Sequence, residues 1–179
     1  MDVDDIITNH KILTTNYKIV ANIPYYITAP IIRLFLECDH RPQELVLMVQ
    51  KEVAERLSAK KGHMSVLGIC AQYYADVTYE FTVPREEFDP VPKVDSAIIK
   101  LKIRNEDLQS ERERKQFFRT VKIGFSAKRK TLSNNISNGF HKTKDFVDSM
   151  LIKNGFTTNV RAQELDVNDW KNIVKELHK

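Results

Sequence analysis

Cysteine, glycine and long apolar runs are scarce in this sequence. The two cysteines, Cys38 and Cys70, lie beside or within apolar stretches, and the five histidines are scattered. Neither pattern gives a Cys-x-x-Cys pair or metal-ligand spacing, so we expect structural thiols and no metal site. No apolar segment approaches the ~20 residues that span a bilayer. Because the first five residues are acidic where a signal peptide would be basic, we expect a cytoplasmic protein that does not enter a membrane.

Glycine is not only scarce but unevenly placed. The five glycines stand at positions 62, 68, 124, 139 and 155. None precedes residue 62, which excludes a glycine-rich phosphate or nucleotide loop in the first 60 residues. The overall composition, 42% hydrophobic and 29% charged over 179 residues, is typical of one or two soluble globular units. A wholly disordered chain is therefore excluded.

Positive charge gathers in the carboxy-terminal part. Residues 1–104 carry 13 Lys and Arg against 14 Asp and Glu, whereas residues 105–179 carry 15 against 10, within a net charge of +4. Such asymmetry indicates that the carboxy-terminal part meets a polyanion. Nucleic acid fits this description first and an anionic membrane surface second, and charge alone leaves both open.

Strand and helix patterns alternate through residues 1–104. The predicted strands are Tyr17–Ala21, Glu44–Gln50, Asp76–Val83 and Ser96–Ile103, and the predicted helices are Ala29–Glu37, Lys51–Leu57 and Met64–Tyr74. Thr28 is expected to cap the first helix, and the nearly continuous apolar strand at Glu44–Gln50 is expected to be buried on both faces. The last two strands are close enough in sequence to be antiparallel. This order predicts the rear half of a doubly wound α/β sheet.

Only helices are predicted after residue 104. They span Ser110–Gly124, Lys128–Ser137, Lys144–Asn154 and Val167–Leu177, with breaks around Gly139 and Gly155. Residues 105–179 are therefore expected to form a small helical domain beside the α/β domain of residues 1–104. About 75 residues give a small core, so we expect the two domains to pack together.

A polar motif follows the first predicted strand. Asn22, Ile23, Pro24 and Tyr25 stand where the strand ends, at the edge of an α/β sheet that binds ligands. The Asn22 carboxamide and a backbone carbonyl held by proline can accept hydrogen bonds from one exocyclic amine, while a tyrosine stacks on the ring that bears it. This arrangement suits adenine or another planar amine. A strand-to-helix turn bent by Pro24, with tyrosines covering the core, is the structural alternative.

A second motif, Phe88–Ser96, contains prolines at positions 90 and 92. Alternate prolines stiffen an extended connection and would display Phe88 on the side of a flipped base opposite Tyr25. The alternative is a stiff hairpin connection with Phe88 in the core.

A third feature is a basic cluster between residues 112 and 130. Eight basic residues stand against the single acid Glu113, with three phenylalanines interleaved; the basic residues are Arg112, Arg114, Lys115, Arg119, Lys122, Lys128, Arg129 and Lys130. The last three lie at a predicted helix start, where donors can meet a phosphate backbone. A solvated helix face is the alternative.

Five segments, in order, resemble those of the ribosomal RNA adenine dimethyltransferases of the KsgA type, a family that includes the erythromycin-resistance methyltransferases. Asn22–Tyr25 is similar to the family's Asn-Leu-Pro-Tyr motif, and Phe88–Ala97 to its Phe-x-Pro-x-Pro-Lys-Val-x-Ser-Ala segment. Gln50–Leu57, Lys128–Asn135 and Arg161–Leu165 also resemble family segments. The last two favour the KsgA type over the resistance enzymes.

The resemblance implies a fold and a reaction. The fold would be the carboxy-terminal half of a Rossmann-like S-adenosylmethionine-dependent methyltransferase sheet, followed by a small all-helical domain. The reaction would be the double N6-methylation of flipped-out adenines in small-subunit ribosomal RNA, with S-adenosylmethionine as cofactor and the small ribosomal subunit as partner. Positioning of the nucleophile would supply most of the rate.

The resemblance also implies roles for particular residues. Asn22 and the Pro24 carbonyl would accept the two amine hydrogens, and Tyr25 and Phe88 would sandwich the base; Asn22 would also border the cofactor. RNA would bind at Lys128, Arg129, Lys130, Arg119 and Lys122.

The sequence departs from the family in the cofactor site. It has no Asn-Phe-Leu-type segment, glycine-rich loop or acidic residue ending a second strand before residue 22. Asp2 would match the acidic residue that lies about twenty residues before the target-base motif in the family. Ile23 replaces a leucine, and Lys61–Ser65 replaces a longer Tyr-Gly loop.

We therefore expect an amino-terminally truncated methyltransferase, inactive on its own. The alternative is a non-catalytic rRNA-binding ribosome-assembly factor, against which the intact motif at residues 22–25 argues.

Overall fold

The computed structural model describes residues 16–104 and 110–179, which divide into two compact units. The sheet unit comprises the described residues up to Ser58 and those from Cys70 to the end of the sheet, and the helical unit comprises Ala59–Ile69 and the helices after the sheet. The predicted domain boundary at residue 104 stays a prediction, and the contact units differ from it in assigning Ala59–Ile69 to the helical unit.

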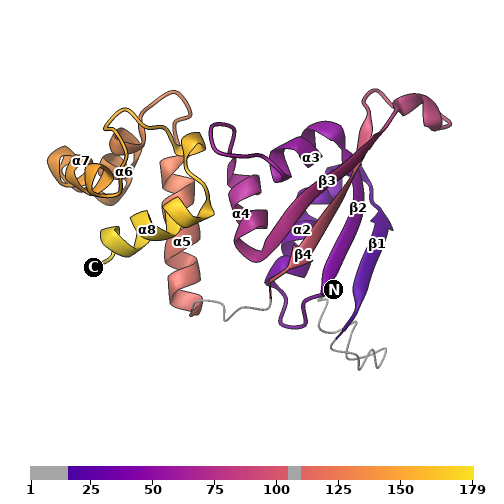
Figure 1. Ribbon diagram of the computed structural model, residues 1–179, viewed down its shortest axis with the longest axis horizontal. Helices are drawn as coiled ribbons and strands as arrows, with labels where there is room; N and C mark the ends of the chain where they lie inside the picture. Colours follow the sequence, from indigo (N-terminus) through magenta and orange to yellow (C-terminus); the bar gives the residue numbers. More distant parts are fainter. Residues whose placement is uncertain (1–15, 105–109) are drawn as a thin grey trace. The chain divides into compact units, whose positions relative to one another are not determined.

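The sheet unit contains four strands in the order β1-β2-β4-β3 (Figure 1). The strands are β1 (Lys18–Asn22), β2 (Glu44–Gln50), β3 (Ala75–Val83) and β4 (Ser96–Ile103). β1 and β2 are parallel, as a crossover through a helix requires, and β4 is antiparallel to both β2 and β3. The expected closing antiparallel pair is therefore confirmed.

One face of the sheet forms the core of this unit. Leu45, Leu47 and Val49 of β2 are fully buried, as are their register partners on β4. The helices are α2 (Thr28–Glu37), α3 (Lys51–Leu57) and α4 (Val66–Tyr74), and the short 3-10 turns are η1 (Tyr25–Ile27) and η2 (Arg85–Glu87). α3 packs against β2, β3 and β4, and Figure 1 shows α2 on the same side of the sheet.

The opposite face of the sheet is only partly covered by the described residues, which corrects the expectation that β2 is buried on both faces. Burial alternates along β2, and Val46 and Met48 are only partly buried. On the same face, Val20 is 79% and Phe81 58% exposed. The helices of this unit cover one face, so the period of two along each strand decides which residues are buried.

Thr28 does not cap α2 as predicted. The turn η1 precedes the helix, so Ile27 takes the cap position and Thr28 is already helical. Its hydroxyl is buried without a hydrogen-bond partner among the described residues.

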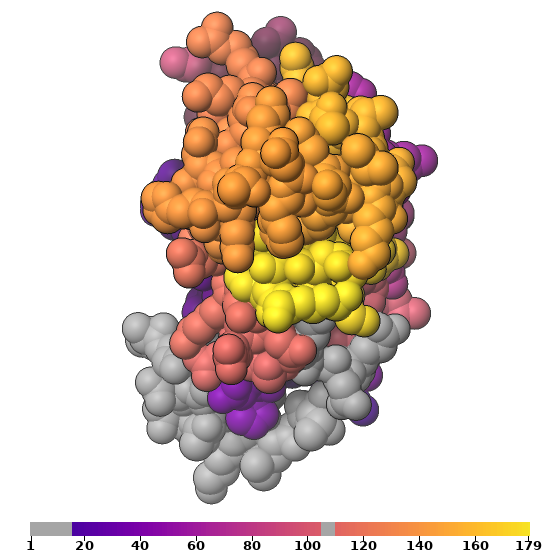
Figure 2. Space-filling view, turned by 90° about the vertical axis from the view of Figure 1, so that its left-hand side faces the viewer, coloured from indigo at the N-terminus to yellow at the C-terminus, as the bar shows by residue number. Residues whose placement is uncertain are grey.

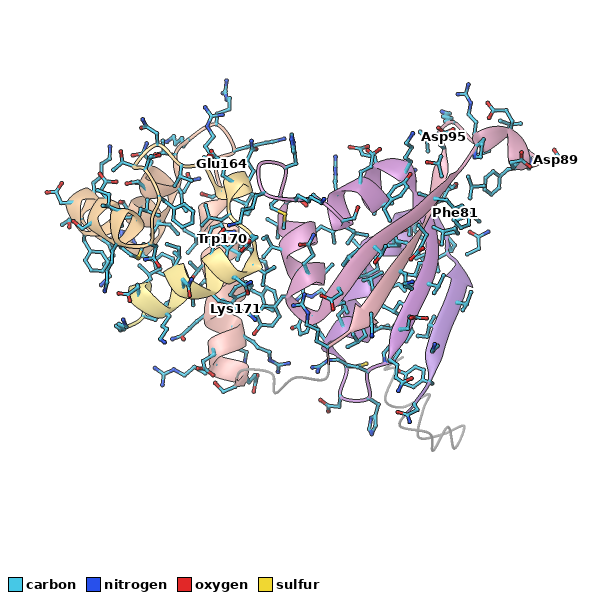
Figure 3. The ribbon with its side chains drawn as sticks, in the orientation of Figure 1. Phe81, Asp89, Asp95, Glu164, Trp170 and Lys171 are labelled. Carbon is cyan, nitrogen blue, oxygen red and sulfur yellow. The ribbon has the colours of Figure 1, made fainter. Side chains whose placement is uncertain are left out.

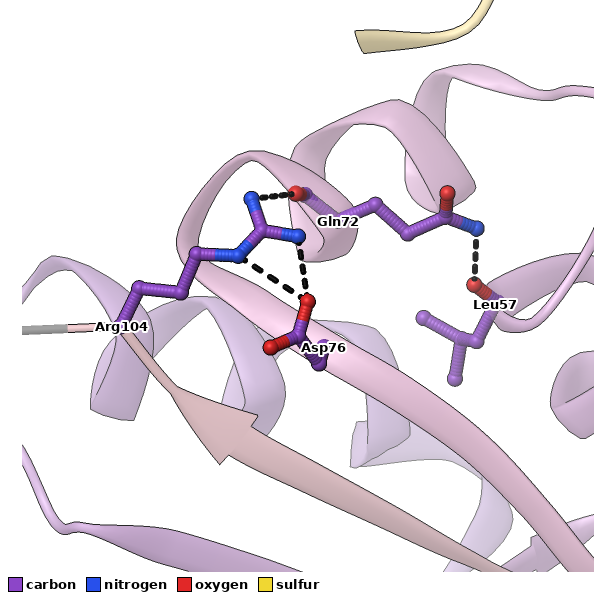
Figure 4. Close-up of polar contacts among 4 residues, drawn as sticks. All are labelled: Leu57, Gln72, Asp76 and Arg104. Carbon is purple, nitrogen blue, oxygen red and sulfur yellow. Dashed lines mark hydrogen bonds and ion pairs between the residues drawn. The ribbon is translucent and has the colours of Figure 1, made fainter.

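At the sheet edge opposite the carboxyl ends of β1 and β2, an ion pair joins the end of β4 to β3 (Figure 4). Arg104 donates from two nitrogens to one carboxylate oxygen of Asp76, at 2.6 and 3.0 Å, and from a third nitrogen to the Gln72 carbonyl at 3.1 Å. The Gln72 side chain in turn donates to the Leu57 carbonyl at 2.8 Å. These bonds tie the end of β4 to β3 and to α4.

The helical unit contains α5 (Glu111–Gly124), α6 (Leu132–Phe140), α7 (Lys144–Lys153), the 3-10 turn η3 (Ala162–Glu164) and α8 (Val167–Leu177). Figure 2 shows this unit face on, with α8 in yellow below the orange helix α7. Trp170, near the start of α8, is fully buried and lies against Gly124 of α5, where a Cβ would stand 2.3 Å from the indole ring (Figure 3). Glycine is therefore required at that contact.

Two boundaries of α6 differ from the prediction. The helix begins after Thr131, whose hydroxyl accepts from the Asn134 amide, and residues 128–130 form a turn before it. Gly139, predicted as a break, lies inside the helix, where a Cβ would meet the Ile123 side chain at 2.3 Å. Close packing of α5 on α6, and not a break, accounts for this glycine.

The segment before α4 attaches to the start of α8. The amides of Gly62 and Met64 both donate to the Gln163 carbonyl, at 3.0 and 3.1 Å. Lys61 pairs with Asp166 and Asp169 at 3.1 and 2.7 Å. Burial opposes ionisation of Asp166, but the Asp169 amide and Lys61 outweigh it and hold the pKa of Asp166 below its usual value.

Candidate functional site

Three of the motif segments meet at one edge of the sheet. β1 ends at Asn22, which pairs with Met48 of β2. β2 continues for two more residues to Gln50, which pairs with Ser96 at the start of β4. The Tyr25 hydroxyl lies 2.6 Å from the Ser96 hydroxyl, so the first motif contacts the end of the second. The Lys51 amide, at the start of α3, donates to the Asp95 carbonyl at 3.0 Å. Residues 22–25, 50–57 and 88–97 therefore form one edge.

The motif at residues 22–25 alternates between exposed and buried positions. Ile23 is 8% exposed and anchors the turn in the core, whereas Asn22 and Pro24 on either side of it are exposed. The Pro24 carbonyl accepts from the Ile27 amide at 3.1 Å. A carbonyl oxygen has two lone pairs, so this bond leaves one for an external donor. Asn22 and Pro24 thus offer two acceptors at the ligand-binding edge.

The partner of Tyr25 is a residue that the sequence interpretation did not single out. Ser96 is fully buried, Tyr25 is half-buried, and their hydroxyls are hydrogen-bonded across 71 positions of the sequence. A bonded hydroxyl restricts rotation of the tyrosine about its side-chain torsions, which fixes the plane of the ring. Ser96 lies within Phe88–Ala97, the segment that resembles a family motif, and this resemblance is the sequence signal that points to it.

Phe88 lies in the connection between β3 and β4, which extends beyond the sheet, with Asp89 near its tip (Figure 3). Phe88 is half-buried and follows η2, and its amide donates to the Arg85 carbonyl at 3.3 Å. Asp95 closes the base of the connection by accepting from the Arg85 amide at 3.3 Å. No ring contact joins Phe88 to Tyr25 among the described residues. The sandwich of a base between these two rings stays a prediction.

The basic residues at 128–130 form an exposed and well-supported turn. Lys128, Arg129 and Lys130 are all exposed between α5 and α6. Asn135, buried in α6, donates from its side chain to the carbonyls of Gly124 and Ala127, at 2.6 and 3.2 Å. These two hydrogen bonds hold the backbone that leads into the turn against α6. Three cations beside the start of a nine-residue helix present the positive end of its dipole together with their own charge.

Arg119 and Lys122 form a second basic position, on α5. They are three residues apart and exposed, so they share one face of the helix. The Arg119 guanidinium lies 5.3 Å from the centre of the Phe140 ring. Lys115, in contrast, is paired with Glu111 at 2.5 Å. The predicted RNA-binding residues thus occupy two exposed positions within one unit, the turn and the α5 face.

A complete cofactor pocket is not formed by these residues. A nucleoside cofactor at a strand edge needs a close approach of backbone and an acidic ligand to the ribose. Between Asn22 and Leu36 the chain has neither a glycine nor an acidic residue, so of the residues in this stretch only Asn22 fits a cofactor at this edge. Asp2 lies outside the described residues.

Neither a metal site nor a membrane span is found in the part of the chain that the structure describes. Across residues 16–104 and 110–179, no group of three or more His, Cys, Asp or Glu side chains is placed to hold a metal ion. In the same residues, every helix is too short or too polar to span a bilayer.

Comparisons with known proteins identify the family. The family model for ribosomal RNA adenine dimethylases matches residues 2–179. The chain is 38% identical over 160 residues to ribosomal RNA small subunit methyltransferase A of Dehalococcoides mccartyi, covering 89% of this chain and 55% of that protein. It is 40% identical over 161 residues to the protein of the same name from Fusobacterium nucleatum, covering 88% and 60%. The chain thus spans a little over half the length of these relatives.

Solved structures agree with the fold. A dimethyladenosine transferase from Plasmodium falciparum superposes with a TM-score of 0.74 at 27% identity, over 90% of this chain and 66% of that one. The 23S rRNA methyltransferase ErmE superposes with a TM-score of 0.74 at 23% identity, over 92% and 66%. These neighbours confirm the α/β, Rossmann-like fold, and the family match confirms the resemblance seen in the motifs. The chain belongs to the ribosomal RNA adenine dimethylase family.

Proposed function

We propose that this chain carries the target-base side and the RNA-binding surface of an rRNA adenine N6,N6-dimethyltransferase of the small ribosomal subunit. One observation carries the proposal. The Asn-Ile-Pro-Tyr motif stands at the carboxyl edge of β1 and is tied to the Phe88–Ala97 segment by the hydrogen bond between Tyr25 and Ser96. A flipped adenine would therefore find acceptors for its amine and a fixed aromatic ring at one place.

The roles follow from the geometry of the edge. The Asn22 carboxamide oxygen and the free lone pair of the Pro24 carbonyl would accept the two hydrogens of the adenine amine. With both hydrogens held, the nitrogen lone pair points away from the protein backbone and toward an incoming methyl group. Tyr25 would hold the ring plane, with Phe88 on the other side. The methylated nitrogen would then lose one proton to solvent, so catalysis on this side is positioning and needs no proton acceptor of perturbed pKa at the edge.

The methyl group would come from S-adenosylmethionine, as the family implies. Asn22 would border such a donor, and we assign the motif at residues 22–25 the acceptor side of the reaction. RNA would be held by Lys128, Arg129 and Lys130 in the turn and by Arg119 and Lys122 on α5. Phosphate contacts of this kind fix register and orientation without reading sequence.

The second candidate is a non-catalytic rRNA-binding factor. The exposed basic residues of the turn at residues 128–130 and of the α5 face would serve such a factor equally well. The two acceptors beside a fixed tyrosine favour the first candidate, because a protein that never modifies a base has no need to hold its amine.

The test is transfer of labelled methyl groups from S-adenosylmethionine to small subunits that lack the modification. The chain is assayed alone, with the full-length Fusobacterium relative in parallel as the positive control. Label in adenine supports the enzyme. Subunit binding without label, while the relative is active, supports the binding factor. Absence of both binding and label contradicts both candidates.

A further inference from the structure

A hollow of about 580 Å³ lies beside the candidate site, within the sheet unit. Its walls are the end of β2, the first turns of α3 and the two ends of the β3–β4 connection. Gln50 and Asp95 line it, and both touch the site as well: Gln50 is the register partner of Ser96, and Asp95 binds the Lys51 amide. A ligand chain lying on Tyr25 can therefore continue into the hollow.

Part of the charge lining the hollow is already neutralised. Glu52 is paired with Arg56, and Glu86 with Arg85 at 3.0 Å. The Arg85 guanidinium and local amides hold the pKa of Glu86 below its usual value, the backbone hydrogen bond contributing most. The Asp95 carboxylate accepts from the Arg85 amide, a neutral donor that leaves its charge in place.

Four charged side chains lining the hollow remain. Among the ion pairs of the described residues, none includes Lys51, Lys93, Glu55 or Asp95. Val94, between Lys93 and Asp95, is 43% exposed and adds an apolar surface. The hollow thus offers two cations, two carboxylates and an apolar patch.

From this arrangement we infer that the hollow binds the RNA nucleotide next to the flipped adenine. Lys51 and Lys93 contact its phosphate, Glu55 accepts from the exocyclic amine of its base, and Val94 packs on the base. The inference rests on the proposed function, because it requires RNA at the Asn22 edge. It also gives a specificity: adenine, guanine and cytosine carry an exocyclic amine and uracil does not, so uridine is disfavoured beside the target.

The experiment measures binding of fluorescein-labelled nine-nucleotide single-stranded RNAs with a central adenosine. The nucleotide on either side is adenosine, cytidine or uridine, and each dissociation constant is measured at several salt concentrations. The Lys51→Ala/Lys93→Ala double variant is compared with Lys102→Ala, an exposed lysine of the same sheet unit at the opposite end of β4. Both lysines of the double variant lie at the surface of the hollow, so folding is preserved.

The double variant should bind about tenfold more weakly. Its salt slope should fall by about 0.7, the contribution of one phosphate of a single strand. Glu55→Gln should bring affinity for a uridine neighbour to within twofold of that for adenosine or cytidine. Glu44→Gln, at the other end of β2, is the control and should keep the wild-type preference.

Failure of the inference can be distinguished from failure of the proposed function. If the wild-type chain binds these RNAs and the double variant matches Lys102→Ala in affinity and slope, the hollow is not a nucleotide site, and the proposed function is untouched. A wild-type chain with equal affinity for all three neighbours removes the role of Glu55. If the wild-type chain binds neither these RNAs nor small subunits, the proposed function itself fails, and the inference fails with it.

Discussion

Within the described residues, the helical unit encloses its large core side chains, whereas one face of the sheet carries exposed apolar side chains. Trp170, Phe117 and Ile136 of the helical unit are fully buried. In the sheet unit, Val20 and Phe81 stand 79% and 58% exposed on the face opposite the helices. Among the described residues, the part with the target-base motif therefore exposes an apolar sheet face, whereas Trp170 and Phe117 of the proposed RNA-binding part are enclosed.

The two units also begin their helices differently. All four α-helices that follow the sheet start with a side-chain cap, from Ser110, Thr131, Thr143 and Asp166. In the sheet unit, α2 and α3 start after Ile27 and Gln50 without one. A cap contributes about 1 kcal/mol of local stability. The helical unit is thus specified largely by local sequence, and the helices of the sheet unit by packing on the sheet.

The largest effect is expected from Trp170→Ala, set against Val20→Ser. Removal of the indole leaves a cavity beside Gly124 and should destabilise the helical unit by about 3–5 kcal/mol. Val20→Ser should change the stability of the sheet unit by less than about 0.5 kcal/mol, because the valine is already exposed. Amide hydrogen exchange, read separately for the two units, measures both. Equal destabilisation by the two changes would contradict the contrast between an enclosed core and an exposed sheet face.

Asn22→Ala tests the role of the sheet edge. Loss of one of two amine acceptors misaligns the nucleophile, so methyl transfer should fall about 100-fold in any preparation that shows activity. Affinity for small subunits should stay within twofold, since Asn22 is not among the proposed phosphate contacts. Asn138→Ala, an exposed asparagine of α6, is the matched control. Near-normal turnover of Asn22→Ala would remove Asn22 from the acceptor side.

The triple change of Lys128, Arg129 and Lys130 to alanine is the converse test. Small-subunit affinity should fall about tenfold at physiological salt, and the salt slope should fall by about 2, because each phosphate contact on RNA adds about 0.7 to 0.9. Lys115→Ala is the control, since that lysine is already paired with Glu111. An unchanged slope would return the turn to the interpretation as a solvated surface.

The smallest effect is expected from His178. Burial, followed by the charges of Arg119, Lys142 and Arg112, lowers the pKa of this histidine below its ordinary value. As the pH falls from 7.5, the unfolded chain takes up this proton before the folded chain does, so the contribution of His178 to stability decreases through and below pH 6.5. Urea unfolding at pH 7.5 and 5.5 measures the loss.

The matched variant is His178→Gln, which should lose less stability between these two pH values than the wild-type chain. Polyanion binding near Arg119 should raise the pKa of His178 and reduce the wild-type loss. A larger loss in the glutamine variant would show that the charge balance around His178 is the reverse of the one described.

Several elements were predictable from sequence because one local signal dominated each. β2, β4, α3 and α8 have the expected bounds, since strong apolar periodicity ends there at polar residues or at a cap. The start of α6 was missed because basic residues suit a helix as well as a turn, and the Thr131 cap decides between them. Gly139 was misassigned because its role is contact with Ile123, which local sequence does not contain.

The candidate site divides in the same way. The placement of Asn22 and Tyr25 at a strand end follows from the strand pattern and was predictable. The partner of Tyr25 and the hollow beside Asp95 depend on register between β2 and β4 and on the path of a long connection. Such features arise from tertiary pairing, so no window of sequence around either residue contains them.

The hydrogen bond between Tyr25 and Ser96 has a consequence for how the family can vary. A phenylalanine at position 25 would leave the fully buried Ser96 hydroxyl without its partner, at a cost of about 1–3 kcal/mol. Replacing both residues by apolar ones of similar shape would be nearly neutral. Relatives that carry phenylalanine at the position of Tyr25 should therefore carry alanine or another apolar residue at the position of Ser96, although the two positions lie 71 residues apart.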